Sequence, residues 1–223
     1  MTQLRRTALQ RERKLRRAIR LRGQLQGKEA AMRKNIILCG VGGQGTILAS
    51  RLIATAAMDK DIPIKTAETI GMAQRGGSVF SHLRLGEGTN SPLIAKGEVD
   101  LIIGFEPGET VRQLPFLKKG GAVVVSSRPV MPVSAMIGQS AYDAAQMIDY
   151  LKAHVERLTI VDADKAAEEL GSAKVLNVVL LGAALESGEL GLDAQDIENA
   201  VRERVPEKLL ELNKKALAWS RGN

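Results

Sequence analysis

The stretch NIILCGVGGQGTILASRLIATAA, from Asn35 to Ala57, determines the fold more than any other part of the chain. A run of apolar residues typical of a buried strand leads into four glycines within six positions. Apolar residues at helical spacing then follow. A bare loop between a strand and a helix is typical of α/β proteins whose backbone N–H groups approach a phosphate. The stretch therefore predicts a strand, a glycine loop and a helix at the start of an α/β domain.

The rest of the chain continues this alternation of strand and helix patterns. Further strands are predicted at 62–68, 100–106, 122–127 and 158–163, and two strands joined by a Gly- and Asn-containing turn at 79–94. Helices are predicted at 46–60, 108–121, 141–155, 164–171, 174–188 and 193–219, the last broken before Pro206. We expect a three-layer α/β/α, Rossmann-like fold with a mostly parallel mixed sheet and one hairpin.

Charge divides the 223 residues into two parts. Residues 1–34 hold 12 of the 32 Lys and Arg residues but only two of the 25 acidic ones, which leaves 35–223 slightly acidic. We therefore expect a basic N-terminal extension over 1–34, helical or frayed, followed by one domain over 35–223. The extension is either a dispensable addition or a basic helix that binds an acidic partner or nucleic acid.

Composition excludes several classes of function. The sequence has no run of eighteen apolar residues and no apolar segment of the signal-peptide type, so we expect a cytoplasmic protein that does not bind a membrane. The single cysteine, Cys39, cannot form an internal disulfide. One cysteine and two histidines cannot hold a zinc ion or an iron–sulfur cluster alone, so redox metal chemistry is expected on another chain.

The glycine loop fits the pattern G-x-G-x-x-G through Gly40, Gly42 and Gly45. Such a loop can bind a phosphate, permit close packing of strand and helix, or admit the backbone of another protein. The candidate ligand residues here are Gly40, Gly42, Gly43, Gln44, Gly45 and Thr46. A dinucleotide site also needs an acid at the end of the second strand, and Glu68 stands about eight residues beyond the usual spacing of about 20.

A second bare loop, GMAQRGGSVFSH, spans 71–82. It offers a guanidinium, an amide and exposed N–H groups just before a strand, and the loops at one edge of such a sheet share a crevice. We expect the two loops to form one site for an anionic ligand or for a partner subunit. The candidate residues of this loop are Gln74, Arg75, Gly76, Gly77 and Ser78.

Four other residues are weighed singly. His82 is the one catalytic candidate, as a proton donor, although a lone histidine in a strand is more often packed or hydrogen-bonded. Cys39 lies in an apolar strand and is expected to be a core residue. Asn177 interrupts an apolar helix and needs a polar partner. Glu106 ends a strand on the expected ligand side.

Several motifs together resemble a known family. The segments GVGGQG, QRGGSV, SPLIAKGEVDLIIGFEPGE, LKKGGAVVVSSRP and KVLNVVLLGA resemble the gamma-type domain of 2-oxoacid:ferredoxin oxidoreductases. Within that family, SPLI and VPEK favour the small (beta) subunit of the indolepyruvate branch. The resemblance covers nearly all of 35–223 and none of 1–31.

The resemblance implies a subunit of an enzyme that oxidatively decarboxylates an aryl 2-oxoacid to an acyl-CoA and passes the electrons to ferredoxin. Thiamine diphosphate, Mg and [4Fe–4S] clusters perform that chemistry, and the resemblance implies that they reside on a large (alpha) partner subunit. The small subunit alone is then expected to be inactive. Its two glycine loops would contact CoA or the large subunit.

Two alternatives from other classes remain. A standalone NAD(P)-dependent dehydrogenase is compatible with the glycine fingerprint, but the ribose acid is poorly placed. A nucleic-acid-binding protein would act through the basic extension, whereas the domain has the wrong sign of charge and few aromatic residues for stacking on bases.

Overall fold

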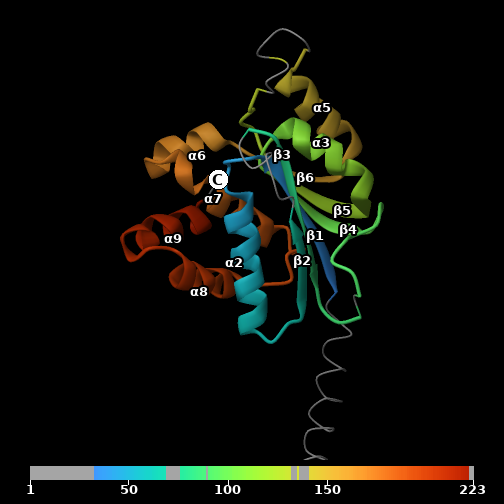
Figure 1. The fold of residues 1–223 in the computed structure, drawn as a ribbon. Coiled ribbons are helices and arrows are strands. Elements are labelled where there is room, and N and C mark those ends of the chain that lie inside the picture. Colours follow the sequence, from blue (N-terminus) through green and yellow to red (C-terminus); the bar gives the residue numbers. More distant parts are fainter. Residues whose placement is uncertain (1–32, 69–75, 89, 132–134, 136–140, 221–223) are drawn as a thin grey trace, which may run out of the picture.

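The computed structural model describes residues 33–68, 76–88, 90–131, 135 and 141–220. Within these ranges, six strands form one sheet in the order β2-β3-β1-β4-β5-β6 (Figure 1). The pairs β1–β4, β4–β5 and β5–β6 are parallel, and β3 is antiparallel to both β1 and β2. The strands are β1 Lys34–Val41, β2 Ile64–Glu68, β3 Ser78–Leu85, β4 Val99–Gly104, β5 Leu117–Ser126 and β6 Arg157–Val161.

Helices cover both faces of the sheet. In Figure 1, α2 and α6 to α9 lie on one side, and α3 and α5 lie on the other. The predicted three-layer α/β/α fold with a mixed, mostly parallel sheet is therefore confirmed. The helices are α2 Thr46–Asp59, α3 Pro107–Gln113, α5 Ala144–His154, α6 Ala163–Leu170, α7 Leu176–Glu186, α8 Ala194–Arg204 and α9 Leu210–Trp219.

The central strands are apolar because both of their faces are buried. Ile36 and Leu38 of β1 point into a core shared with α2 and α7 to α9. Ile37 and Cys39, which alternate with them, point into a second core that includes Leu151 of α5. This alternation places the carboxyl end of β1 between two packed layers, and that packing fixes where the glycine loop begins.

Residues 79–94 do not form the two strands that the pattern predicted. Only β3 is a strand, and it pairs with β2 and β1. Side chains of β3 hold the following segment: the Arg84 guanidinium donates to the carbonyl oxygens of Ser91 (3.3 Å) and Leu93 (3.1 Å). The backbone N–H of Ile94 donates to His82 Nδ1 (3.1 Å). Side-chain bonds thus replace the expected ladder of backbone hydrogen bonds.

The helix predicted over 108–121 is shorter than expected. α3 ends at Gln113, a short 3₁₀ turn covers Leu114–Phe116, and β5 already begins at Leu117. Pro115 lies inside the 3₁₀ turn, where its missing N–H stops the helix from continuing. The two glycines at 120–121 therefore belong to β5 and do not close a helix.

The carboxyl-terminal part follows the prediction. α8 ends at Arg204 and α9 begins at Leu210, so the break before Pro206 is confirmed. Residues 1–32 of the basic extension lie outside the described residues. No helix in the described ranges combines the length and the apolar character needed to span a membrane.

Candidate functional site

The two glycine loops meet at the carboxyl end of β1. β3 runs antiparallel to β1 with Ser78 opposite Val41, which brings the residues before β3 beside the first loop. Two backbone hydrogen bonds join the loops: the N–H of Gly42 donates to the Gly77 carbonyl (2.8 Å), and the N–H of Gly76 donates to the Gly42 carbonyl (3.1 Å). Gln74 and Arg75, two predicted site residues, lie outside the described residues.

Gln44 ties the first loop to the neighbouring parallel strand. Its Oε1 accepts a hydrogen bond from the Val41 N–H (2.7 Å), and its Nε2 donates to the Phe105 carbonyl (2.9 Å) just beyond β4. The side-chain amide thus satisfies two backbone groups that no strand partner reaches. Gln44 positions the loop through these bonds.

The predicted glycines have different roles. A Cβ on Gly40 would stand 2.7 Å from Phe105 Cβ, so this glycine permits the close approach of the end of β1 to the end of β4. Gly43 and Gly45 have φ of +106° and +89°, a region that favours glycine. A Cβ on Gly45 would stand 3.1 Å from the amide nitrogen of the buried Asn177, whereas one on Gly43 would meet nothing within 4 Å.

A first pocket of about 210 Å³ opens beside these glycines. The Gly42 N–H already donates to the second loop, so it is not available to a ligand. The N–H groups of Gly43 and of Gly45 to Leu48 have no acceptor among the described residues. The first turn of α2 contains no acidic residue, so its positive end favours an anion. The glycine-loop pocket is lined by Gly42, Gly43, Gly45, Thr46, Ile47 and Val79.

A second pocket of about 260 Å³ lies on the other side of the joined loops. Two buried carboxylates line it, and both make hydrogen bonds. Glu106 accepts from the Glu109 N–H (2.8 Å) and from the Tyr142 hydroxyl, and Glu109 accepts from Ser78 Oγ (2.5 Å). The glutamate pocket is lined by Val41, Gly76, Gly77, Ser78, Glu106, Gly108, Glu109, Arg112, Val130, Met131 and Tyr142.

The charges around the two pockets differ. Burial and the hydrogen bond to Glu106 raise the pKa of Tyr142 above its usual value, so the hydroxyl keeps its proton and remains a donor. Arg112, a cation that lines the glutamate pocket, has a largely exposed side chain and pairs with Glu109 (3.4 Å). The buried carboxylates repel a phosphate from the glutamate pocket, whereas the glycine-loop pocket offers a phosphate N–H donors that have no acceptor within the described ranges.

His82 lies away from both pockets. Its Nδ1 accepts the Ile94 N–H, and its ring contacts Phe80 and Phe116 with centroid separations of 5.5 and 5.7 Å. Burial lowers the pKa of the imidazole, which keeps it neutral. These contacts are those of a packed, hydrogen-bonded histidine. This is the alternative to a proton donor that the sequence indicates for His82.

Cys39 is buried in the second core. Burial raises the pKa of its thiol, so no thiolate is available for nucleophilic chemistry. The described residues hold no group of three or more His, Cys, Asp or Glu side chains able to bind a metal ion.

Glu68 does not occupy the position that a dinucleotide enzyme requires. β2, which it ends, is separated from β1 by the antiparallel strand β3. Its Oε1 accepts a hydrogen bond from Ser50 Oγ of α2 (2.9 Å). In the dinucleotide-binding fold, the acid closes the strand that lies directly beside β1. The geometry thus removes the main support for the dehydrogenase alternative.

Sequence reasoning missed Glu109, Arg112 and Tyr142. The segment Glu106-Pro107-Gly108-Glu109 could have indicated Glu109. A hydrogen-bond acceptor followed by proline at the first helical position marks the start of a helix, which places Glu109 in its first turn. Tyr142 reaches Glu106 from 36 residues further along the chain, and no local pattern predicts such a contact.

Comparison with known proteins agrees with the fold. Residues 35–220 match the family model described as pyruvate ferredoxin/flavodoxin oxidoreductase. The indolepyruvate oxidoreductase subunit IorB of Archaeoglobus fulgidus is 40% identical over 83% of this chain and 92% of its own length. The subunit IorB of Thermococcus kodakarensis is 36% identical over 82% and 91%.

Among solved structures, the keto/oxoacid ferredoxin oxidoreductase gamma subunit of Geobacter sulfurreducens superposes with a TM-score of 0.59. It is 25% identical and covers 82% of this chain and 94% of its own. The family match over 35–220 includes the sequence of both glycine loops. The chain therefore belongs to the pyruvate ferredoxin/flavodoxin oxidoreductase family.

Proposed function

We propose that the chain is the small subunit of an indolepyruvate ferredoxin oxidoreductase. Such an enzyme oxidatively decarboxylates an aryl 2-oxoacid, forms an acyl-CoA and transfers the electrons to ferredoxin. The observation that carries this proposal is the 40% identity to the indolepyruvate oxidoreductase subunit IorB of Archaeoglobus fulgidus over 92% of the length of that protein.

The chemistry of the reaction is assigned to a large partner subunit. The sequence has one cysteine, and Cys39 is buried as a protonated thiol, whereas a [4Fe–4S] cluster needs several thiolate ligands. When bound, thiamine diphosphate with Mg would stabilise the carbanion, and the clusters would carry the electrons. The small subunit contributes the crevice at the carboxyl ends of its strands.

Within that crevice, the glycine-loop pocket is proposed to bind a phosphate of CoA. Its free N–H groups, the positive end of α2 and the absence of acidic side chains in the lining all suit a phosphate. The bonds of Gln44 and the two bonds between the loops hold these donors in place without a ligand. The ligand would therefore meet a preformed site.

The glutamate pocket takes a different role in this proposal. Its buried carboxylates and the hydroxyl of Tyr142 form one closed network that fixes the start of α3 beside the second loop. Ser78, a predicted ligand residue, donates to Glu109 in that network. The network thus holds the second loop in place, and Gly76, Gly77 and Ser78 of that loop support the first glycine loop.

Copurification tests the proposal. The full chain, isolated from its native source under anaerobic conditions, is expected to bring with it a large subunit that contains thiamine diphosphate and iron–sulfur clusters. Size-exclusion chromatography followed by mass spectrometry and iron analysis identifies such a partner. Isolation of the chain as a free species, with NAD(P)H-dependent activity of its own, would overturn the proposal.

A further inference from the structure

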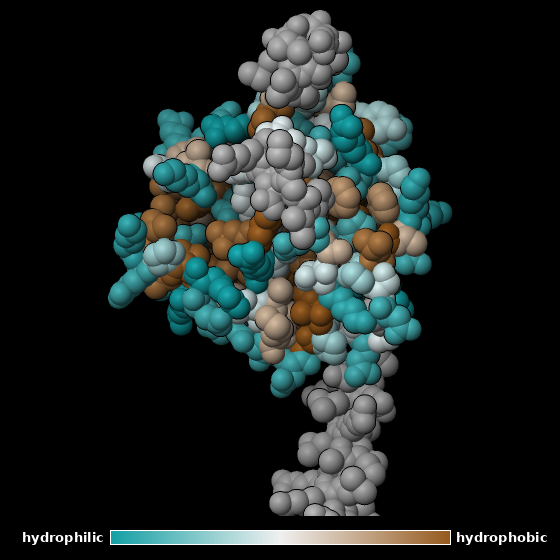
Figure 2. Space-filling view, in the orientation of Figure 1, coloured by the Kyte–Doolittle hydropathy of each residue, from teal (hydrophilic) through white to brown (hydrophobic). Residues whose placement is uncertain are grey.

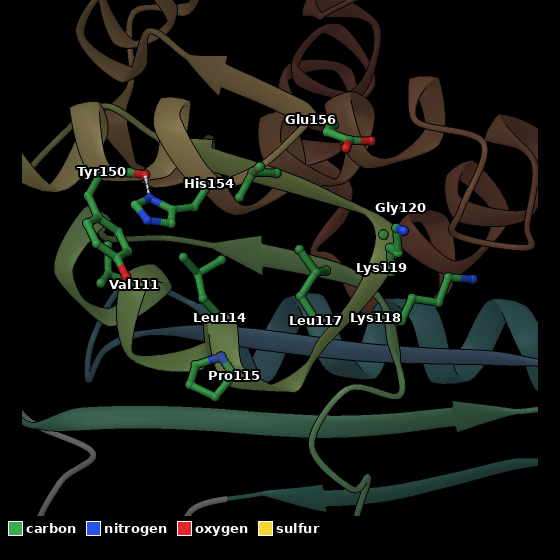
Figure 3. Close-up of a pocket in the computed structure, with 12 residues that line it drawn as sticks. Val111, Leu114, Pro115, Leu117, Lys118, Lys119, Gly120, Tyr150, His154 and Glu156 are labelled. Carbon is green, nitrogen blue, oxygen red and sulfur yellow. Dashed lines mark hydrogen bonds between the residues drawn. The ribbon is translucent and has the colours of Figure 1, made fainter.

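A third pocket lies at the amino ends of the parallel strands, opposite to the end that carries the glycine loops. It is bounded by the amino end of β5, the residues before β6, and the helices α3 and α5, and its volume is about 460 Å³ (Figure 3). We call it the lysine–aromatic pocket. Its lining residues are Val111, Leu114, Pro115, Leu117, Lys118, Lys119, Gly120, Gly121, Tyr150, His154, Val155 and Glu156.

A bulge at the start of β5 forms one wall of this pocket. Between the pairs Val99–Leu117 and Leu101–Ala122, β4 advances by two residues and β5 by five. The extra residues leave the ladder of β5, as in other bulges, and carry the side chains of the two lysines to the surface. Gly121 permits this close packing, because a Cβ would stand 2.7 Å from Leu117 Cδ1 and 3.0 Å from the Val99 carbonyl oxygen.

Aromatic rings form the facing wall. The rings of Tyr150 and His154 stack with their centroids 4.0 Å apart and their planes at 20°. His154 Nδ1 lies 2.8 Å from the Tyr150 carbonyl oxygen, which can only accept, so Nδ1 is the donor of this hydrogen bond. Figure 3 shows these rings at one end of the pocket, the lysines at the other, and Leu114 and Leu117 between them.

The two lysines of the pocket differ in their partners among the described residues. Lys118 pairs with Asp100 of β4. Lys119 makes no hydrogen bond or ion pair with any residue that the structure describes, and its side chain is exposed. Glu156, on the same pocket, is likewise unpaired within the described ranges, and its negative charge disfavours ligands that carry several negative charges. The arrangement favours a single anionic group at Lys119.

We propose that the lysine–aromatic pocket binds a small aromatic monocarboxylate. The ring of the ligand lies on the apolar floor formed by Leu114 and Leu117, with its far edge toward Tyr150, and its carboxylate pairs with Lys119. The volume is within the range typical of small-molecule sites. This site and the glycine loops lie at opposite ends of the parallel strands, so a ligand here does not compete with CoA. The inference therefore does not depend on the proposed function.

Titration of the purified full chain tests this site. The fluorescence anisotropy of 2-naphthoate, an aromatic monoanion, is expected to rise to saturation with one site per chain. Lys119→Met, which keeps the apolar stem, weakens 2-naphthoate binding about fivefold, the size expected for an exposed ion pair. It leaves the binding of uncharged 2-naphthylmethanol unchanged. Tyr150→Ala weakens the binding of both compounds.

A matched control is Lys152→Met, because Lys152 is an exposed lysine of α5 that pairs with Asp149 and does not line the pocket. It is expected to bind 2-naphthoate as the unchanged chain does. Tyr150 is 47% exposed, so its truncation leaves the core intact, and circular dichroism verifies this. Absence of saturable binding, or equal affinities of the Lys119→Met and Lys152→Met chains, would overturn the proposal.

Discussion

Gly43 provides the sharpest separation of a ligand-binding role from a packing role. Its φ is +106°, and a Cβ on it would meet nothing within 4 Å in the described chain. Gly43→Ala therefore costs only the backbone strain of a non-glycine residue, about 1–2 kcal/mol of the free energy of unfolding. A methyl group placed among the free N–H donors of the pocket should nevertheless raise the KM for CoA at least about tenfold, which is about 1.4 kcal/mol of binding.

Gly171→Ala is the matched control. Gly171 follows α6, has φ of +68° and also has open space around a Cβ, but it does not line the glycine-loop pocket. Its stability loss should resemble that of Gly43→Ala, whereas the KM for CoA of the assembled enzyme should not change. Urea unfolding of the isolated chain measures the first quantity, and steady-state kinetics of the complex measure the second.

Two results would refute this reasoning in different ways. An unchanged KM for CoA together with normal assembly in Gly43→Ala would mean that the loop binds no phosphate and contacts no partner. Failure of the variant to join the large subunit would assign the loop to the subunit interface. Gly45→Ala cannot make this distinction, because its Cβ would also crowd Asn177 inside the chain.

Further predictions concern the loop, the acid range and the extension. Gln44→Ala leaves the Val41 N–H and the Phe105 carbonyl without their partner and should lower the free energy of unfolding by about 1–3 kcal/mol in urea titrations; a loss below the error of the measurement would contradict the bridging role. Hydrogen bonds from Arg157 and Lys34 lower the pKa of Glu189 to about 2. The ion pairs of Glu189 with these two residues therefore stabilise the fold above pH 4.5, and this contribution to the free energy of unfolding is lost as the pH falls toward 2. After a discount for solvent screening, Glu189→Gln should cost about 1–2 kcal/mol at pH 7 and almost nothing at pH 2, and a cost that is independent of pH would argue against the ion pair. Deletion of 1–31 should leave turnover and assembly with the large subunit unchanged, which a pull-down with the truncated chain checks.

Local sequence patterns predicted those strands and helices whose hydrophobic periodicity and end signals lie within the element or directly beside it. The buried run before Gly40 and the helical spacing after Gly45 are both continuous in sequence, and the structure places β1 and α2 there. The error at 91–94 has a different origin. The side chains of His82 and Arg84 reach across and hold that segment, and a pattern of apolar residues does not record such hydrogen bonds.

The candidate site was only partly predictable for the same reason. The glycine loops stand out by composition, but the contact between Gly42 and Gly77 depends on β3 entering the sheet beside β1. The buried carboxylates Glu106 and Glu109 line a pocket together with Tyr142, which belongs to a distant segment of the sequence. The sequence predicts the end of a helix where β5 has its bulge before Ala122, so no local pattern indicates the lysine–aromatic pocket.

Reconstitution of activity tests the central claim most directly. The large subunit and this chain are purified separately, and the reduction of a viologen dye is measured with indolepyruvate and CoA. The account predicts no dye reduction by this chain alone and CoA-dependent reduction when the two are mixed. Dye reduction by this chain alone, or full activity of the large subunit without it, would contradict the account.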